Sequence, residues 1–586
     1  METIEDLKQY TFPALLANSV KKFYDRPALA LVGEYPVSYG QVKEKSEALS
    51  YVLEQIGLKK ESKIVILGTG RPEWGIAYFA IVNRGMIAVP LLPDFSVAEV
   101  ESILAHCGVD AMFVEEKLYK KIECLGDNLP KTIIKLEDYS LIRGDEEAYE
   151  KADHFVRHHA SEIKKALVPV EIDEDATASI IYTSGTTGRS KGVELSHKNI
   201  VWTSVQCQSV HRVNKIDRAL SFLPLSHVYE FTIGFVMMLL NGACVYYLGK
   251  PPVVSALLPA FEKVEPTIVL SVPLVMEKIY KNKVLPTFQS NKILYVLYRI
   301  APFRKMLNRA AGKKLKKTFG GHLVFFGIGG AKVDPKVEKF LKEANFPYAI
   351  GYGLTETSPL LAGSGTKITF PGTVGPVMEG VELVINNPDP KTKVGEVVAK
   401  GPNIMKGYYR DPELTKSVFT TEEDSAGPGY FKTGDLGLIA KKKGLVRLSL
   451  KGRNKNMILG PSGENIYPED IEFILNQNPF VNESLVVEGD GGLVALVKVD
   501  EEKLEEEAKQ RSLRDRIENN VQKVSRDLAW HKEAILGEIQ FFVNTRVNKS
   551  SHIGKIEKID EFEKTATQKI KRYIYELKEK AKSKIK

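Results

Sequence analysis

The chain has 586 residues, which is too many for one hydrophobic core, so two or more domains are expected. Its hydrophobic content of 43%, charged content of 27% and formal net charge of +8 are those of a soluble globular protein, and no aromatic or helix-turn-helix signature of a nucleic-acid partner accompanies the charge. The four cysteines form no CxxC pair, which argues against a zinc site and a disulfide framework and suits a reducing cytosol.

The first part of the chain alternates between strand and helix patterns. Its acidic N-terminus has no apolar core, so no signal peptide is predicted. The alternation predicts a largely parallel sheet covered by helices. The expected strands are 63–67, 87–91 and 111–114, with helices over 73–82 and 97–105, and the pattern recurs as a strand at 267–272, a helix at 274–280 and a strand at 323–326.

A loop rich in glycine and hydroxyl groups, residues 182–192, follows the apolar run 178–181. Its hydroxyls can donate to anionic oxygens, its glycines let the backbone approach a ligand, and Lys191 adds a positive charge. The loop therefore has the composition of a phosphate cradle. Its spacing is not that of a Walker A loop, because Lys191 precedes a glycine. A flexible loop without a ligand is the competing interpretation.

The longest apolar stretch, residues 231–249, raises the question of a transmembrane helix. Asn241 and Gly242 interrupt it. We therefore interpret it as a buried helix through Leu240, a turn, and a strand over 244–247.

From about residue 380 the pattern changes to short β-like runs separated by glycines, such as 381–385 and 395–399. We expect a β-rich subdomain at about 375–452 and a domain boundary at 452/453. Beyond the boundary, a helix at 469–475, strands at 484–487 and 494–499 and a charged helix around 501–528 predict a small α+β domain that ends at residue 586.

The C-terminal end is strongly basic. Residues 564–586 contain nine Lys and Arg against Glu576 and Glu579. Such an end attracts anionic partners such as phosphates or an anionic membrane surface, which would make the protein peripherally membrane-associated. A solvated helix end, whose lysines suit the helix dipole, explains the same pattern, and both interpretations stay open.

Four further segments join the phosphate loop: Gly351–Thr357, Tyr430–Asp435, Lys451–Lys455 and Lys564–Lys571. Each is weak alone, because a tyrosine is usually core and a lysine usually solvated. Their order and spacing, from about residue 10 to residue 575, resemble the adenylate-forming enzymes, which include acyl-CoA synthetases, peptide-synthetase adenylation domains and firefly luciferase. The resemblance implies a large N-terminal adenylation domain (1–452) of mostly parallel sheets with helices and the β-rich subdomain. It also implies a small mobile α+β C-terminal domain (453–586).

The resemblance also implies roles for individual residues toward ATP. The loop from Thr183 to Lys191 would wrap the β- and γ-phosphates, Tyr352 would stack on adenine, and Asp435 would accept hydrogen bonds from the ribose. Arg453 would contact ribose or phosphate, and Thr355 the α-phosphate. The full set of implied ATP-binding residues is Thr183, Ser184, Gly185, Thr186, Thr187, Gly188, Lys191, Gly330, Ala331, Tyr352, Gly353, Asp435 and Arg453.

The remaining implied roles concern the reaction. Glu356 would hold Mg²⁺, His227 would flank the acyl carbon, and Lys569 would reach the reacting carboxylate and the α-phosphate. Lys455 matches the hinge, within 453–455, about which the small domain turns before CoA attacks the acyl-AMP, and Gly463 would lie beside the pantetheine tunnel.

This sequence departs from the family pattern at two places near these residues. Gln568 stands where glycine is common, and the loop around Gly463 is one residue longer than usual. The competing interpretation of His227 is a histidine packed in the core. The apolar run 231–240 could line an acyl pocket, or it could belong to the core.

Segments 223–230 and 271–280 resemble the long-chain fatty acyl-CoA synthetase branch, although that branch commonly has arginine where Leu274 stands. The expected enzyme is an ATP- and Mg²⁺-dependent fatty acid–CoA ligase of the cytoplasm. Three alternatives are an acyl–acyl carrier protein synthetase, which shares the first step, a nucleotide-binding regulator without turnover, and a free-standing peptide-synthetase module.

Overall fold

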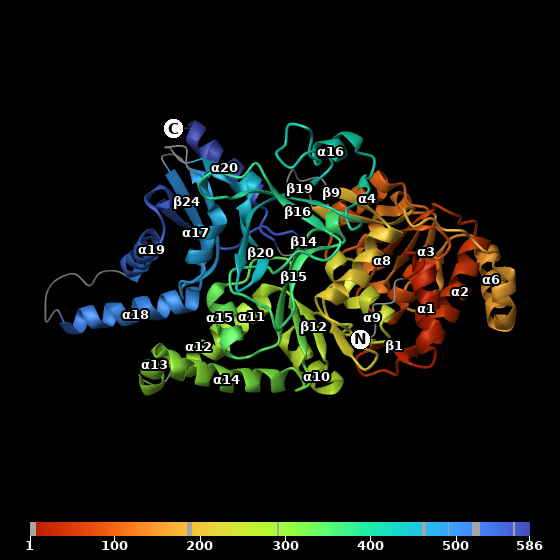
Figure 1. Cartoon of the computed structure of the whole chain (residues 1–586), viewed down its shortest axis with the longest axis horizontal. Coiled ribbons are helices and arrows are strands. Elements are labelled where there is room, and N and C mark those ends of the chain that lie inside the picture. Colours follow the sequence, from red (N-terminus) through yellow and green to blue (C-terminus); the bar gives the residue numbers. More distant parts are fainter. Residues whose placement is uncertain are drawn as a thin grey trace.

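The computed structural model describes residues 7–184, 190–289, 292–459, 465–489, 492–518, 528–565 and 569–585. In Figure 1 the chain runs from N-terminal helices such as α1 and α2 at the right, through the green segments in the centre, to a blue C-terminal part at the left. Gly185, Thr186, Thr187, Gly188 and Gly463, to which the sequence assigns roles, lie outside the described residues.

Two large sheets, each of eight strands among the described residues, form the body of the molecule. The first has the order β18-β9-β8-β4-β3-β5-β6-β7, and its central pairs are parallel. Its strands are β3 (Lys63–Leu67), β4 (Ile87–Leu91), β5 (Ala111–Val114), β6 (Thr132–Lys135), β7 (Leu141–Arg143), β8 (Thr177–Ser184), β9 (Ser190–Ser196) and β18 (Gly407–Tyr408).

The second large sheet has the order β15-β14-β13-β12-β10-β11-β1-β2 and is parallel except at its two edges. Its strands are β1 (Pro27–Leu31), β2 (Val37–Ser38), β10 (Arg218–Ser221), β11 (Cys244–Tyr247), β12 (Ile268–Ser271), β13 (Phe325–Ile328), β14 (Tyr348–Gly353) and β15 (Leu360–Ser364).

Three smaller sheets follow in the sequence: an antiparallel β16-β17-β19-β20 sheet, the β21-β22 pair, and a β23-β24-β25 sheet. The strand β20 ends at Arg453, where the predicted domain boundary and hinge lie; both stay predictions. These strands are β16 (Glu382–Asn386), β17 (Gly395–Lys400), β19 (Phe431–Lys442), β20 (Leu445–Arg453), β21 (Ile458–Leu459), β22 (Asn465–Ile466), β23 (Val481–Gly489), β24 (Gly492–Val499) and β25 (Ile553–Lys558). We call the described residues through Arg453 the larger body and those after it the C-terminal part.

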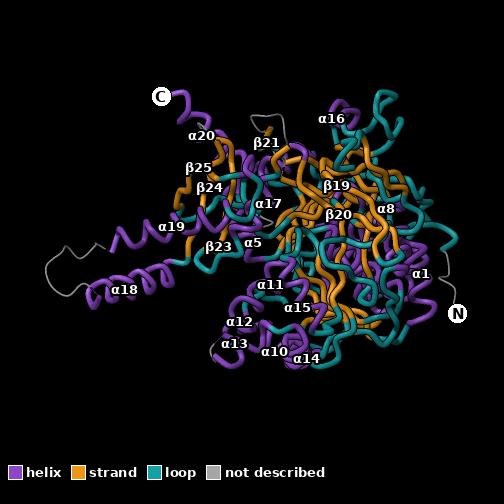
Figure 2. Tube along the Cα trace, turned by 60° about the vertical axis from the view of Figure 1, so that its left-hand side comes forward, coloured by secondary structure: helices purple, strands orange, loops and turns teal. Residues whose placement is uncertain are grey.

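Helices cover the large sheets and the last small one, as the tube in Figure 2 shows. The α-helices are α1 (Phe12–Phe23), α2 (Tyr39–Gln55), α3 (Pro72–Val82), α4 (Val97–Cys107), α5 (Glu116–Ile122), α6 (Glu146–His158), α7 (Ile163–Ala166), α8 (His197–Gln206), α9 (Met237–Leu240), α10 (Val254–Val264), α11 (Pro273–Ile279), α12 (Leu285–Gln289), α13 (Lys292–Arg299), α14 (Ala301–Thr318), α15 (Pro335–Glu343), α16 (Pro412–Ser417), α17 (Pro468–Leu475), α18 (Glu501–Glu518), α19 (Leu528–Asn544) and α20 (Arg572–Ile585). The short 3-10 and π segments are η1 (Glu123–Asn128), η2 (Ala160–Glu162), η3 (Cys207–Ser209), η4 (Glu230–Val236), η5 (Tyr280–Val284), η6 (Thr355–Thr357), η7 (Asn454–Asn456) and η8 (Lys549–Ser551).

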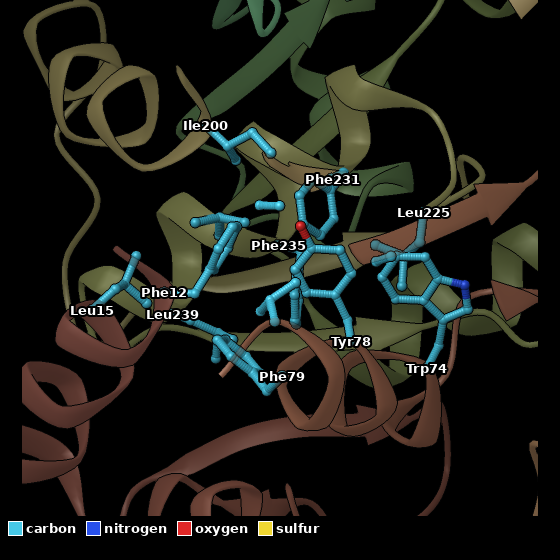
Figure 3. Close-up of a cluster of buried hydrophobic side chains, with 14 of the residues drawn as sticks. Phe12, Leu15, Trp74, Tyr78, Phe79, Ile200, Leu225, Phe231, Phe235 and Leu239 are labelled. Atoms are coloured by element: carbon cyan, nitrogen blue, oxygen red, sulfur yellow. The ribbon is translucent and has the colours of Figure 1, made fainter. Parts of the chain in front are cut away.

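The helix that the sequence predicts at the apolar stretch 231–240 consists of η4, a π-helix, followed by α9. Figure 3 shows Phe231 and Phe235 on η4 among aromatic side chains of α1 and α3. The ring centroids of Tyr78 and Phe231 are 4.5 Å apart, and Trp74 stacks on Tyr78 at 5.7 Å. Because η4 is buried inside the body, its apolar length reflects the core. Among the described residues, no helix is both long and apolar enough to cross a membrane.

The predicted α/β class is confirmed, and strands β3, β4, β5 and β11 have the predicted bounds. Several predicted bounds were wrong in detail, including that of the strand expected at 484–487, which is β23 and covers Val481–Gly489. Strand β13 begins at Phe325 rather than at residue 323, because its ladder with β12 starts at the pair Ile268–Phe325. The charged helix predicted over 501–528 ends, as α18, at Glu518, and Leu528 already belongs to the separate helix α19, which the sequence did not predict.

Candidate active site

The ends of the predicted phosphate loop are held by a β-hairpin. Strands β8 and β9 pair antiparallel, with Thr183 opposite Lys191, and Ser184 ends β8. The strand β18 adds to the outer edge of β9 and brings Tyr408 beside this hairpin. The glycine-rich segment therefore joins two strands of the larger body, where the sequence predicts a cradle.

Lys191 and Glu356, predicted for phosphate and Mg²⁺, are brought together by Tyr408. The Lys191 ammonium lies 5.2 Å from the centroid of the Tyr408 ring, and the Tyr408 hydroxyl donates to Oε1 of Glu356 at 2.9 Å. Burial and the nearby charge of Lys455 lower the pKa of Lys191, and Glu356 opposes this shift. Tyr408 was missed in the sequence, because only its pairing to β9 reveals its position.

Tyr352, Asp435 and Arg453 form a second group. The Tyr352 hydroxyl donates to Oδ2 of Asp435 at 2.8 Å, and Nε of Arg453 lies 2.9 Å from Oδ1 of the same carboxylate. Asp435 and Arg453 are partners across strands β19 and β20. Burial raises the pKa of Asp435, and Arg453 opposes the rise. The carboxylate is thus held in one orientation, with both oxygens engaged.

The backbone predicted to flank the nucleotide lies at the ends of β13 and β14. Gly330 has a φ of +87° and is exposed, as is Ala331. At Gly353 a Cβ atom would lie 1.6 Å from the carbonyl oxygen of Pro359, so glycine is required there by the fold itself. Thr355 opens the short helix η6 directly after β14 and is half-buried.

His227 lies within electrostatic reach of Lys569, although the two are far apart in sequence. Burial, then the charge of Lys569, lowers the pKa of His227 to about 4. The backbone N–H of Tyr229 donates to Nδ1 of His227 at 3.3 Å. The ring is therefore neutral near pH 7, and with Nδ1 accepting, its proton is assigned to Nε2. The histidine is best described as a hydrogen-bond donor at the edge of the site.

Lys569 is carried on a turn of the C-terminal part. The turn is closed by an isolated bridge between Lys564 and Ile570 and by a hydrogen bond from Thr565 N to Lys569 O at 2.8 Å. Although the residue is exposed, protein atoms surround its ammonium group closely enough to lower its pKa by desolvation. The charge of Arg453 lowers this pKa further, while Asp435 and Glu356 raise it. Lys569 thus interacts with both groups of the larger body.

Contacts between the C-terminal part and the larger body keep this turn at the site. Lys332 forms an ion pair with Asp470 at 2.8 Å, and the Lys281 ammonium donates to the carbonyl of Val481 at 2.7 Å. Lys455, in the 3-10 turn η7, lies between the two parts in sequence. Next to it, Asn456 donates to Glu469 at 2.6 Å.

Glu356 is the carboxylate beside the phosphate hairpin, and its setting is compatible with Mg²⁺. Within the described residues, no group of three or more His, Cys, Asp or Glu could hold a metal ion. Glu356 is half-buried, and its Oε1 already accepts from Tyr408. Mg²⁺ commonly binds through one or two carboxylates together with substrate phosphates, so Glu356 beside the phosphate hairpin suits that ion.

A small apolar cavity of about 40 Å³ lies behind these groups. It is lined by Ile233 and Met237 from the η4–α9 helix and by residues of β12 and β13, including Leu270 and Phe325. Phe231 and Phe235, drawn in Figure 3, belong to the core together with Ile233 and Met237, and the latter two also border the cavity.

Comparisons with known proteins agree with this geometry. Residues 16–409 match the family described as AMP-binding enzyme. Fatty acyl-CoA synthetase A of Dictyostelium discoideum is 27% identical over 487 residues, which are 78% of this chain and 70% of that protein. Long-chain-fatty-acid–[acyl-carrier-protein] ligase AEE15, chloroplastic, of Arabidopsis thaliana is 25% identical and covers 89% of this chain and 81% of its own length. The anthranilate CoA ligase AuaEII, solved in complex with anthranoyl-AMP, superposes with a TM-score of 0.74 at 19% identity over 100% of both chains.

Proposed function

Because the chain belongs to the AMP-binding enzyme family, we propose that it activates a long-chain fatty acid with ATP and transfers the acyl group to CoA. The carboxylate attacks the α-phosphorus, pyrophosphate leaves, and an acyl-AMP forms. The CoA thiol then attacks the acyl carbon, releasing AMP and forming the thioester. The observation that carries this proposal is the convergence of Lys569, Asp435–Arg453 and Glu356–Lys191 on one site.

The first step brings two anions together, so positive charge must offset their repulsion. Lys569 can reach the attacking carboxylate and the α-phosphate, and Lys191 can neutralise the departing pyrophosphate. The pKa of each lysine is lowered in the protein alone, and an incoming polyphosphate favours the charged form of both. Neutral His227, whose Nδ1 accepts from Tyr229, would offer its Nε2 proton to the acyl end of the substrate.

The nucleotide would be oriented by groups that are already in place. The Asp435 carboxylate, fixed by Arg453 and Tyr352, offers acceptors to ribose hydroxyls. The Tyr352 ring and the backbone at Gly330 and Ala331 would contact adenine. Glu356 would hold Mg²⁺, which when bound neutralises phosphate charge.

The second step requires Lys569 to leave, since the thiol approaches the same carbon. We assign the hinge to Lys455, in the 3-10 turn η7 that follows β20. The ion pair Lys332–Asp470 is exposed and can be exchanged for water at little cost. A rotation of the C-terminal part about η7 would thus replace the lysine turn with another face of that part.

The fatty acid assignment is supported by the apolar cavity lined by Ile233, Met237, Leu270 and Phe325. The cavity is smaller than an acyl chain, so a bound chain must displace some of these side chains. The preference for long chains rests on the Arabidopsis thaliana relative, whose name specifies a long-chain fatty acid. An acyl carrier protein in place of CoA is a second candidate acceptor, because the chloroplastic ligase resembles most of the chain.

The test is an assay of purified full-length protein with ATP, Mg²⁺ and fatty acids of increasing length. AMP and pyrophosphate should appear with long chains, and labelled acyl groups should move to CoA. Transfer to holo carrier protein instead of CoA would select the second acceptor. Failure to form AMP with any fatty acid would overturn the proposal.

A further inference from the structure

The connection between β12 and β13 is far longer than the sheet requires. A parallel crossover needs about a dozen residues. Here it runs from residue 272 to 324 and contains α11, η5, α12, α13 and α14. We call α13 and α14, residues 292–318, the basic helix pair. Figures 1 and 2 both place it with α10 along one margin of the molecule.

This connection and the residues just after it carry a long, acid-free run of positive charge. Residues 278–333 contain thirteen Lys and Arg and no Asp or Glu, which exceeds the net charge of +8 of the whole protein. The basic helix pair contributes nine of them. The basic C-terminal end is therefore not the only concentration of positive charge.

The inner face of α14 is fixed to the body. Arg304 forms an ion pair with Glu343 of α15 at 2.9 Å, and Asn308 donates to the same carboxylate at 2.8 Å. The Tyr298 hydroxyl of α13 donates to Asn308 at 3.0 Å. At Gly312 a Cβ atom would lie 2.4 Å from the carbonyl oxygen of Ala344, so the two helices are in close contact. The outer face is consequently held in a fixed orientation.

The outer face carries an exposed apolar stripe. Five apolar side chains are open to solvent: Ile293 at 71% and Val296 at 59% on α13, Ile300 at 45% between the two helices, and Phe303 at 43% and Met306 at 59% on α14. Several exposed apolar side chains on neighbouring helices, among many cations, indicate an interaction site rather than ordinary surface.

A basic cavity of about 630 Å³ lies between α14 and the C-terminal end of α15. Lys305, Arg309, Lys313 and Lys316 of α14 line it, with Lys342 of α15. Its one carboxylate, Glu343, is engaged by α14, as described above. Burial, and then the charges of Lys443 and Arg447, lower the pKa of Lys342, which indicates a concentrated positive potential.

We propose that the basic helix pair lies on an anionic phospholipid bilayer, with the apolar stripe at the boundary between headgroups and acyl chains and lipid phosphates at the basic cavity. Aliphatic side chains beside an acid-free run of lysine and arginine complement such a surface. A nucleic acid complements the charge but not the stripe, because exposed aliphatic residues do not stack on bases. With 18 residues, α14 extends about 27 Å and lies flat rather than crossing the bilayer.

The proposed membrane surface does not depend on the proposed reaction, although both involve strands β12 and β13. Leu270 of β12 and Phe325 of β13 border the apolar cavity, and the connection that ends in the basic helix pair leaves and enters the sheet at those two strands. The connection that carries the proposed membrane surface is therefore joined directly to the two strands that border the cavity.

The test is co-sedimentation of the full chain with vesicles of phosphatidylcholine, with and without phosphatidylglycerol. Wild type should bind only the anionic vesicles. The variant Lys305→Gln/Arg309→Gln/Lys313→Gln should bind about a hundredfold more weakly at low salt, since each cation near a membrane contributes about fivefold. The variant Val296→Ser/Phe303→Ser/Met306→Ser should bind at least about tenfold more weakly, and its loss should persist at high salt.

Two matched controls locate the surface. Lys151, Lys164 and Lys165 are exposed on α6 and α7, and Figure 1 places α6 at the opposite end of the molecule from α13. Changing these three lysines to Gln removes equal charge and should leave binding unchanged. Removing the cations of α20 tests separately whether the basic C-terminal end also contributes to vesicle binding. Wild type that ignores anionic vesicles, or helix-pair variants that bind as wild type does, would overturn the proposal.

A spectroscopic measurement guards against misfolded variants. Val296→Trp adds an indole to the stripe, whereas the native chain has three tryptophans, none of them in the basic helix pair. Its added fluorescence should shift to the blue and be quenched by brominated lipids in anionic vesicles. An unchanged spectrum from protein that co-sediments would place the contact elsewhere and contradict the proposal.

Discussion

The two parts of the candidate active site differ in how firmly their side chains are held. In the larger body, Asp435 is bound by Tyr352 and Arg453, and Glu356 by Tyr408. Lys569 instead arrives on a short turn of the C-terminal part and reaches the same groups through charge. The larger body is therefore preorganised to bind a nucleotide, whereas the C-terminal part supplies a cation that can be withdrawn.

Replacement of Lys569 should have the largest effect, because it removes the cation that the C-terminal part supplies. Lys569→Ala is expected to reduce acyl-AMP formation by about 10² to 10³, or about 3–4 kcal/mol, because it removes the cation that interacts with Asp435 and Glu356. Conversion of supplied acyl-AMP and CoA should continue. Pyrophosphate exchange and thioester formation measure the two steps separately.

Lys571→Ala is the matched control, since Lys571 closes the same turn through its backbone N–H to Glu563. It should retain both steps. Equal loss of both steps in Lys569→Ala would show that the lysine supports the structure rather than the first reaction.

Burial of a carboxyl in the larger body gives the next largest effect. Glu230, on η4, is buried, and within the described residues its Oε2 has no hydrogen-bond partner. Burial raises the pKa of Glu230 to about 8, and Ser221 opposes the rise. The unfolded chain loses this proton near its ordinary value of about 4.3, so stability is full below that pH and is lost as the pH rises toward 8.

Glu230→Gln should therefore flatten the fall in stability between about pH 5 and pH 8 and add a few kcal/mol near pH 9, a value that follows from the pKa shift. Denaturant midpoints across this pH range measure the change. Glu262→Gln, at an exposed position of α10, should leave the wild-type curve unaltered. A Gln variant that follows the wild-type curve would show that Glu230 is ionised in the folded protein.

Lys569 and Glu230 show how much of the site could be predicted from the sequence. Lys569 was found because its segment resembles a family pattern, and the strands β3, β4 and β5 were found because buried runs of four or five apolar residues have few other uses. Tyr408 and Glu230 gave no such signal. Tyr408 is positioned by the pairing of β18 with β9, and Glu230 by the packing of η4. Both positions depend on contacts between residues distant in sequence.

The same limit applies to charge. The sequence showed the basic C-terminal end, but the importance of residues 278–333 appeared only when the structure separated the inner face of α14 from the outer one. A helix whose apolar residues are exposed has the same periodicity as one whose apolar residues are buried, so the period alone cannot tell which face is covered.

The proposed hinge can be tested by fixing one torsion. The 3-10 turn at Lys455 suits the φ of about −65° that proline imposes. Lys455→Pro should spare acyl-AMP formation in the arrangement described here. It should slow thioester formation about ten- to a hundredfold if the second arrangement needs another φ, since such strain costs about 1–3 kcal/mol. Lys455→Ala removes the charge without the constraint, so a similar defect in both variants would assign the effect to charge.

The smallest expected effect tests the preorganised part. Tyr352→Phe keeps the ring but removes the hydroxyl that donates to Asp435, so the KM for ATP should rise by about five- to tenfold, as expected for one lost hydrogen bond of about 1–1.5 kcal/mol. The kcat should change little, because the turnover step depends on Lys569. Tyr352→Ala also removes the stacking surface and should raise the KM by a further factor of about ten. If the Phe variant matches wild type, the hydroxyl does not orient Asp435. If the Phe and Ala variants are alike, adenine does not stack on this ring. The preorganisation of the larger body, in contrast to the C-terminal part, would then rest on Asp435 and Arg453 alone.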